Sequence, residues 1–219
     1  MNSLKMKEHH TRGFLITVCG LDGCGKTTLI KRLKKEIEDN EGYEVILTKQ
    51  PSENMRKSDI FRTYMDSEDH SSYEYRSLSL MAAADRVQHV NKVILPELNN
   101  GKCVICDRYF YSCLANLRAR GYEKDRWIYD ISKNIIKPDL SFFLDVPVEL
   151  AVSRVRERAE ERDRYIDMDL QYKLRDQYIK ICKENHGALI SSDECEDRTF
   201  NDAYKQLKNV IERRNEKNV

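Results

Sequence analysis

A glycine-rich loop that ends in lysine and threonine is the part of this sequence best suited to bind phosphate. The loop reads Gly20, Leu21, Asp22, Gly23, Cys24, Gly25, Lys26 and Thr27, followed by Thr28. Such spacing is typical of a phosphate loop, whose backbone N–H groups surround an anion at the positive end of a helix. We expect Lys26 to reach the β- and γ-phosphates of a nucleotide and Thr27 to hold Mg²⁺. The alternative interpretation is a simple turn that carries a solvated lysine.

An acid and an arginine follow an apolar run further along the chain. Asp107 and Arg108 come directly after residues 103–106, which have the composition of a buried strand. Ligands bind at the carboxyl ends of the strands in open α/β sheets. We therefore expect Asp107 to orient Mg²⁺ or its waters and Arg108 to bind phosphate. Asp107 is also suited to cap the helix that follows, and the two roles are compatible.

A stretch rich in arginine follows the fourth apolar run. Its arginines are Arg154, Arg156, Arg158, Arg162 and Arg164. Enzymes that transfer phosphoryl groups work mainly by positioning and charge neutralisation, so we interpret residues 154–166 as a lid that closes over reacting phosphates. In a continuous helix, Arg154, Arg158 and Arg162 would share one face. Acidic residues are interleaved with them, and a solvated helix laced with salt bridges is the alternative.

Two further charged residues have unusual sequence surroundings. Asp22 lies inside the loop, where an acid beside bound phosphates is electrostatically costly, which suggests a contact with a hydroxyl group or a cation. Arg86 follows the small residues 82–84, which leave room for a flat ligand. An ordinary exposed arginine on a helix fits the same spacing.

The elements that position these residues alternate between strands and helices. Apolar runs predict strands at 14–19, 44–48, 103–106, 140–146 and 188–191. Helical spacing predicts helices over 27–39, over 75–95 with an end at Pro96, over 167–185 and from about residue 200. This alternation predicts an α/β fold, a five-stranded parallel sheet flanked by helices, in one domain over residues 1–219. We expect residues 1–12 to be disordered.

Composition excludes several classes of protein. The 219 residues carry a formal net charge of +1, so no global basic field favours nucleic acid, and no aromatic platform accompanies the arginines. No apolar run reaches the ~18 residues that a membrane helix needs, and the polar start is not a signal peptide. The seven cysteines suit a reducing cytoplasm. Cys103 and Cys106 form a C-x-x-C pair within a strand, where they face opposite sides as core thiols.

Taken together, these segments resemble the thymidylate kinase family of P-loop nucleoside monophosphate kinases. The matching segments are residues 20–28, 84–90, 107–109 with Ser112, 144–147 and the arginine-rich lid with Asp163 and Arg164. They occur in the order of the family and extend over residues 14–185. The resemblance implies that the γ-phosphoryl group of ATP passes to a nucleoside 5′-monophosphate, with dTMP the expected acceptor. It also implies Mg²⁺ as cofactor and a homodimer in the cytoplasm.

The resemblance implies a role for each candidate residue. Lys26 and Thr27 would serve ATP and Mg²⁺, and Arg108 would grip the acceptor phosphate, with Tyr109 beside it in the substrate site. Arg62 is the better candidate for a second phosphate arginine and Arg56 the second. Arg86 would reach the base edge and Asp22 the sugar hydroxyl. Some members carry an arginine where Gly23 stands here, and the others take the catalytic arginine from the lid, which implies Arg154, Arg156 or Arg158.

The sequence departs from the family around the acceptor base. Ala82 replaces the usual stacking aromatic residue, residues 116–117 replace a common Tyr-Gln pair, and residues 49–51 read Lys-Gln-Pro instead of Arg-Glu-Pro. Loss of a stacking ring costs on the order of 1 kcal/mol. A kinase of another pyrimidine nucleotide or of a nucleoside is therefore one alternative. A P-loop ATPase or a nucleotide-binding regulatory module is the alternative from a different class.

Overall fold

The computed structural model describes residues 4–66 and 73–217, and within them five strands form one sheet. The strands are β1 (Phe14–Gly20), β2 (Val45–Lys49), β3 (Cys103–Asp107), β4 (Leu140–Asp145) and β5 (Ala188–Ser191). Every pair of neighbours is parallel, and the order across the sheet is β2-β3-β1-β4-β5. The five-stranded parallel sheet predicted from the sequence is confirmed.

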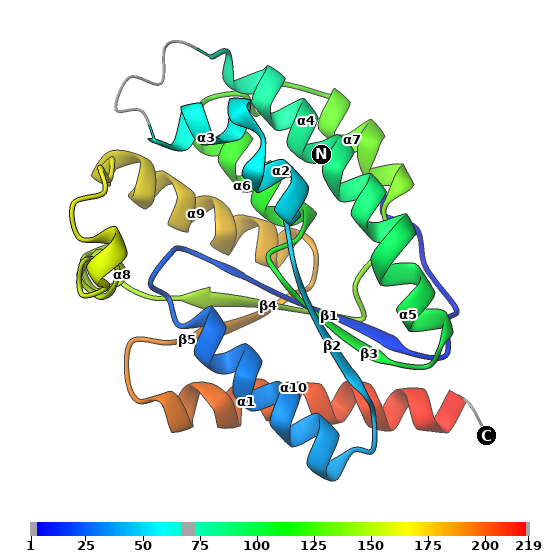
Figure 1. Ribbon diagram of the computed structural model, residues 1–219. Helices are drawn as coiled ribbons and strands as arrows, with labels where there is room; N and C mark the ends of the chain where they lie inside the picture. Colours follow the sequence, from blue (N-terminus) through cyan, green and yellow to red (C-terminus); the bar gives the residue numbers. More distant parts are fainter. Residues whose placement is uncertain (1–3, 67–72, 218–219) are drawn as a thin grey trace.

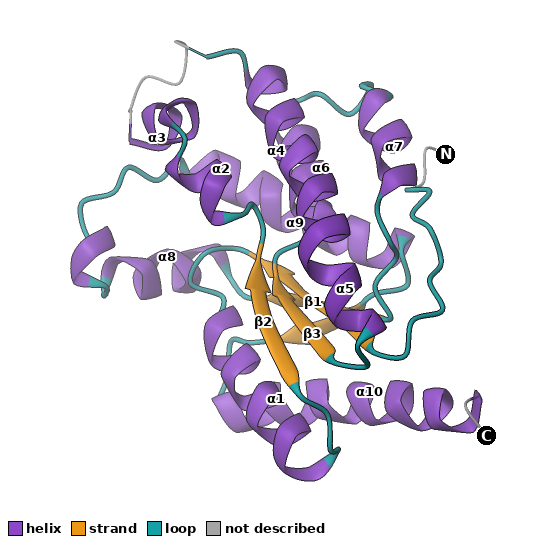
Figure 2. Ribbon diagram, turned by 45° about the vertical axis from the view of Figure 1, so that its right-hand side comes forward, coloured by secondary structure: helices purple, strands orange, loops and turns teal. Residues whose placement is uncertain are grey.

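Helices cover both faces of this sheet (Figure 1). Below it lie α1 (Lys26–Asn40) and α10 (Glu196–Lys217), and above it lie α4 (Tyr75–His89), α5 (Leu95–Asn99), α6 (Phe110–Ala119) and α9 (Met168–Glu184). Three shorter helices complete the upper part of the molecule, namely α2 (Glu53–Lys57), α3 (Asp59–Asp66) and α7 (Trp127–Ile131), and α8 (Val148–Arg156) lies at the left side in Figure 1. Figure 2 shows the sheet enclosed between these layers, as expected when parallel strands are apolar on both faces.

The central strand fixes where the functional residues meet. All seven residues of β1 are buried, and β1 pairs with β3 on one side and with β4 on the other. The register places Val18 opposite Asp107 and Gly20 opposite Leu144. The carboxyl ends of β1, β3 and β4 therefore lie at one edge of the sheet, and the phosphate loop, Arg108 and the lid all start there.

The prediction of one helix over 75–95 that ends at Pro96 is wrong in detail, because the helical chain continues past Pro96. The chain forms α4, then a π-helical turn η2 (Val90–Ile94), and then α5, in which Pro96 occupies the first turn. A proline lacks an N–H group, and the first turn of a helix leaves that group without an intrahelical acceptor. The wider π turn resets the hydrogen-bond ladder, so the helix continues past the proline.

The predicted disorder of residues 1–12 is wrong for residues 4–12, while 1–3 lie outside the described residues. The Lys7 N–H donates to the Ile135 carbonyl at 2.8 Å, and the Lys137 N–H donates to the Lys7 carbonyl at 2.7 Å. His9 lies 3.1 Å from the Asp139 carboxylate. Backbone pairing of this kind needs no apolar side chains, so the polar composition of the segment concealed it. The last helix also begins earlier than predicted, at Glu196.

The two cysteines predicted to be core thiols are indeed inside the sheet. Cys103 and Cys106 are buried in β3, and none of the seven cysteines, all within the described residues, forms a disulfide. In the same part of the chain, no helix is both long enough and apolar enough to cross a membrane.

Candidate active site

The phosphate loop connects β1 to α1 and lies against the helix that leads into the lid. Gly23 has a φ of 82°, and a Cβ atom there would lie 2.0 Å from the carbonyl oxygen of Ala151 in α8. Any side chain at this position would collide with backbone. The loop therefore has no space for an arginine at residue 23, and positive charge for phosphoryl transfer must come from other segments.

Lys26 is buried at the start of α1 and points back into the loop. Its ammonium group donates to the carbonyl oxygens of Leu21 at 2.6 Å and Gly20 at 3.3 Å. These contacts keep the charge at the centre of the ring of backbone amides, where the β- and γ-phosphates of a nucleotide would lie.

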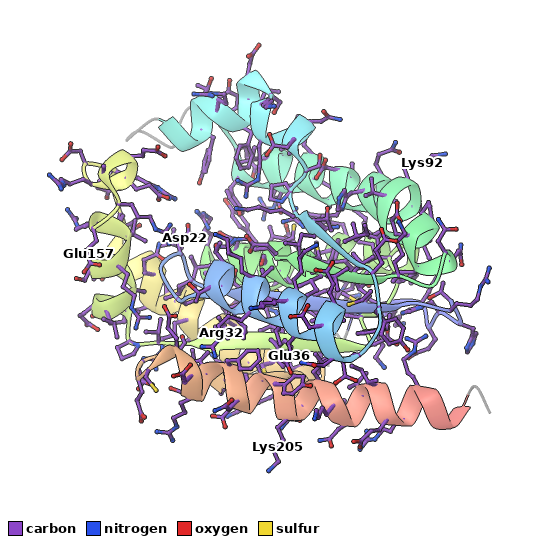
Figure 3. All side chains as sticks on the ribbon, turned by 60° about the horizontal axis from the view of Figure 1, so that its bottom comes forward. Asp22, Arg32, Glu36, Lys92, Glu157 and Lys205 are labelled. Carbon is purple, nitrogen blue, oxygen red and sulfur yellow. The ribbon has the colours of Figure 1, made fainter. Side chains whose placement is uncertain are left out.

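Asp22 lies between two arginines from distant parts of the chain. One carboxylate oxygen accepts a hydrogen bond from Arg108 at 2.7 Å, and the other lies 3.6 Å from Arg164 of the lid. Figure 3 shows Asp22 on the loop, at the end of the molecule where the lid carries Glu157. Removal of water raises the pKa of Asp22, but the charges of Arg108, Lys26 and Arg164 outweigh that effect and lower the pKa below its ordinary value. Asp22 is therefore an anion that holds the lid near the loop.

Arg108 has a strained backbone and a guanidinium group that is held by two partners. Its φ is 66°, a conformation that is costly for any residue with a Cβ atom and that is often found at functional sites. Its N–H group donates to Val18 in β1 at 2.9 Å, and its guanidinium donates to the Tyr178 hydroxyl at 2.8 Å as well as to Asp22. Tyr178 in turn donates to the Ser112 hydroxyl at 3.1 Å.

Tyr178 is a residue that the sequence did not reveal. It occupies α9 together with the buried Leu174, Ile181 and Cys182, so its spacing indicates a core position. No signal in the sequence distinguishes it from an ordinary aromatic core residue. Its contact with Arg108 arises only when α9 packs beside α6 and the sheet.

The surroundings of Asp107 fit a divalent cation. One carboxylate oxygen lies 3.3 Å from the Lys49 ammonium group, and the other is buried without a hydrogen-bond partner among the described residues. Asp107 and Thr27 line the same cavity of about 550 Å³. The helix that follows is capped at Tyr109 instead of at Asp107, so the capping alternative does not hold. A free carboxylate oxygen and a hydroxyl group are ligands that Mg²⁺ prefers.

The lid differs from the continuous helix that would align its arginines. Helix α8 ends at Arg156, and a 3₁₀ turn over Ala159–Glu161 follows. Arg154 donates to the Ser192 carbonyl at 2.9 Å, whereas Arg158 lies 3.2 Å from Glu161. Arg154 and Arg158 nevertheless line one cavity of about 210 Å³.

That cavity lies beside the phosphate loop. Gly23, Gly25 and Thr28 of the loop and α1 contribute to its wall, and the segment after β5 forms the opposite wall. Arg156 and Arg162 are exposed and do not line this cavity. The structure thus brings Arg154 and Arg158 to the donor side, and the salt-bridge interpretation describes only Arg158 and Arg164, both of which lie near Glu161.

On the acceptor side, the prediction for Tyr109 is wrong. Tyr109 is fully buried, and its hydroxyl donates to the Ile136 carbonyl at 2.7 Å, so it does not face a substrate. Arg62 lies exposed on α3, where its role in binding phosphate stays a prediction, and Arg56 on α2 is half-buried. Arg56 donates to the Pro51 carbonyl at 3.0 Å. Burial and the nearby charge of Arg108 lower the pKa of Arg56, which places the two cations in one electrostatic environment.

Arg86 is buried in α4, contrary to the alternative of an exposed helix arginine. Its guanidinium donates to the Ala82 carbonyl at 2.8 Å, and its Nε has no partner among the described residues. Ala82 packs against a second core cluster formed by Met55, Tyr64 and Leu78. A small residue at position 82 therefore leaves space that α2 and α3 fill.

Asn116 is held by its neighbours. Its amide nitrogen donates to the Ser112 carbonyl at 2.9 Å, and its oxygen accepts from Arg120 at 2.7 Å. Both ends of this side chain are thus engaged within the protein.

A phosphate loop, a fixed arginine at the adjacent strand end and an arginine-bearing lid define a nucleotide kinase of the P-loop class. The sequence model of the thymidylate kinase family matches residues 18–199. The chain is 41% identical to a probable thymidylate kinase of Pyrococcus horikoshii, over 78% of this chain and 84% of that protein. It is 31% identical to a probable thymidylate kinase of Staphylothermus marinus, over 91% of this chain and 94% of that protein. It is 29% identical to the thymidylate kinase of Ligilactobacillus salivarius, over 91% of this chain and 99% of that protein. The chain belongs to the thymidylate kinase family.

Proposed function

We propose that this protein transfers the γ-phosphoryl group of ATP to dTMP, giving dTDP and ADP, with Mg²⁺ as cofactor. The observation that carries the proposal is the position of Arg108, which contacts the phosphate loop through Asp22 and stands beside Arg56 on the acceptor side. Membership of the thymidylate kinase family supports dTMP as the acceptor.

The donor is held by the phosphate loop. The loop amides and Lys26 bind the β- and γ-phosphates, while Arg154 and Arg158 close the cavity beside them. Thr27 and Asp107 would hold Mg²⁺, which when bound neutralises charge on the β- and γ-oxygens. Gly23 supplies no charge, so the lid arginines neutralise the negative charge that develops as the phosphoryl group moves.

The acceptor is held at the end of β3. Arg108 and Arg56 bind its phosphate and turn one oxygen toward the γ-phosphorus. That oxygen forms the new P–O bond while the bond to the bridging oxygen of ADP breaks, which is the usual in-line course of phosphoryl transfer. Arg86 has a free Nε to bind the edge of the base. Asp22 accepts the sugar hydroxyl when the lid arginine Arg164 shifts.

A panel of acceptors tests the proposal. ADP release from ATP·Mg²⁺ is measured with dTMP, dUMP, UMP, CMP, thymidine or no acceptor. We expect the largest stimulation by dTMP and none for the Lys26→Ala variant. Stimulation by UMP or CMP alone would mean that the acceptor is not dTMP, while the proposed kinase chemistry would still hold. ADP release that no acceptor stimulates would overturn the kinase proposal in favour of an ATPase or a binding module.

The assembly that we propose is a homodimer in the cytoplasm. Three large apolar side chains are exposed on the outer side of α4 and η2, namely Leu80, Met81 and Val93. Apolar side chains of this size are expected where two subunits meet. Six of the seven cysteines are buried thiols, which supports a reducing compartment. Light scattering of the protein and of its Leu80→Glu variant tests the dimer, which the variant should dissociate.

A further inference from the structure

A basic cleft opens away from the active site, between the end of α6 and the middle of α9. Its volume is about 470 Å³. The charged side chains that line it are Arg118, Arg120, Lys173, Lys180 and a single acid, Asp176. It shares no lining residue with the cavities beside Thr27 and beside Arg154. The cleft is therefore separate from the site that binds ATP and the acceptor.

The two arginines of the cleft are fixed in place. Arg118 donates to Glu184 at 2.8 Å and to the Tyr129 hydroxyl at 3.1 Å. Arg120 donates to Asn116 and lies over the ring of Tyr75, with 4.1 Å from its guanidinium carbon to the ring centre. Each guanidinium has five N–H groups, so both retain donors for a ligand. Fixed guanidinium groups lose little side-chain entropy when an anion binds.

The two lysines of the cleft have no internal partner. Lys173 and Lys180 are exposed, and neither forms a hydrogen bond or an ion pair with any residue in the ranges that the structure describes. They lie seven positions apart on α9, which is close to two helical turns and places them on one face. Their charge is thus free to act on a ligand.

Hydrogen bonds at the carboxyl end of α6 reduce the repulsion that an anion would meet there. The N–H group of Gly121 donates to the Arg118 carbonyl and that of Tyr122 to the Leu117 carbonyl, both at 3.0 Å. These bonds satisfy the carbonyl groups of Leu117 and Arg118, which would otherwise leave partial negative charge at this end of the helix. Among the described residues that line the cleft or form an ion pair with one of its four cations, the acids are Asp176 and Glu184.

We propose that this cleft binds an oligophosphate group, carried by a nucleoside triphosphate or by free inorganic polyphosphate. Clefts lined by charge of one sign concentrate the field, and arginine with lysine is the combination that binds phosphate. Cations from two helices surround a space large enough for several phosphate groups. Single-stranded nucleic acid is not favoured, because the nearby rings of Tyr75 and Tyr122 are already covered by Arg120 and Arg76.

The experiment counts binding sites for sodium tripolyphosphate by isothermal titration calorimetry. We expect two molecules per chain in the unaltered protein and one in Lys26→Ala, whose donor site is disabled. Adding Lys173→Glu and Lys180→Glu to Lys26→Ala should weaken the remaining binding at least ~10-fold, since each reversal replaces attraction by repulsion. The control adds Lys92→Glu and Lys205→Glu to Lys26→Ala. It should not weaken the remaining binding, because Figure 3 shows both lysines pointing away from the protein.

Three results would overturn the proposal. The first is binding of only one tripolyphosphate molecule per chain by the unaltered protein. The second is unchanged tripolyphosphate affinity after the charge reversals at residues 173 and 180. The third is binding of inorganic monophosphate as tight as that of tripolyphosphate. Circular dichroism checks that each variant is folded. A second arm replaces tripolyphosphate by dTTP. Tighter binding of dTTP would support a nucleoside triphosphate as the carrier, and equal binding would support free polyphosphate.

Discussion

Arg108 donates one hydrogen bond to Asp22 in the phosphate loop and another to Tyr178 in α9, at 2.7 and 2.8 Å. One guanidinium group thereby joins the loop that binds the donor to the helix that follows the lid. A guanidinium group that two partners hold is already in position before the acceptor arrives. Such preorganisation is a large part of catalysis by charged groups.

The Tyr178→Phe variant tests the second of these bonds. Removing the hydroxyl leaves Arg108 with one anchor, and a hydrogen bond to a charged group contributes about 1.5 to 3 kcal/mol. We expect kcat/KM for dTMP to fall at least ~10-fold while KM for ATP changes little. Steady-state kinetics with both substrates measures this. Tyr172→Phe on the same helix is the control, because its hydroxyl contacts the exposed Glu149 instead. Equal losses for both variants would contradict the role of Tyr178.

The Asp22→Asn variant tests the anion between Arg108 and Arg164. The folded protein lowers the pKa of Asp22 from its ordinary 3.8. The stability that the charge contributes is therefore fully present above about pH 3.8 and is lost only as the pH falls toward the lowered pKa. We expect the variant to unfold at a lower temperature at pH 7 and at pH 5, by the same amount, and the difference to shrink below pH 3.8. Thermal unfolding at each pH measures this. A difference that vanishes by pH 5 would contradict it.

The Gly23→Ala variant tests the packing of the loop against α8. The added methyl group would meet the Ala151 carbonyl, and φ is positive, so both backbone segments must move. We expect a loss of about 2 kcal/mol or more in the free energy of unfolding together with weaker ATP binding. Gly42→Ala is the matched control. Its φ is 72° and nothing lies within 4 Å of the added atom, so it should cost only the left-handed backbone, about 1 to 2 kcal/mol, with ATP binding unchanged.

The Asp139→Asn variant tests the attachment of the N-terminal segment. Asp139 accepts from the Leu15 N–H at 2.7 Å and from Arg214 at 2.6 Å, and lies next to His9. Loss of its charge should lower the free energy of unfolding by about 2 kcal/mol, measured in urea. Turnover should not change, because Asp139 precedes β4, at the sheet edge opposite the phosphate loop. Asp130→Asn, whose partner is the exposed Lys133, should have little effect.

The sequence predicts the sheet and the donor loop well, because both leave local signals. Short apolar runs mark the strands, and glycine spacing marks the loop. The side chains that complete the site are set by contacts between distant segments, and these leave no local signal. Tyr178 meets Arg108 across 70 positions. Arg56 and Arg62 both follow Pro51, and only the fold decides which of them turns toward Arg108. Tyr109 belongs to the segment 107–109 that matches the family, yet its hydroxyl points into the core and not toward a substrate.

The close contact between Gly23 and Ala151 also determines which part of the lid can move. The loop backbone lies against Ala151 and Val155, so α8 must travel with the loop as one rigid piece. The hinge therefore lies beyond Val155, and the next fixed point is Asp167, whose carboxylate caps α9 by accepting from the Leu170 N–H. We therefore expect the site to open by a swing of the one short loop that carries Arg158 and Arg164, with no displacement of a domain. Product release would then require only the motion of this loop.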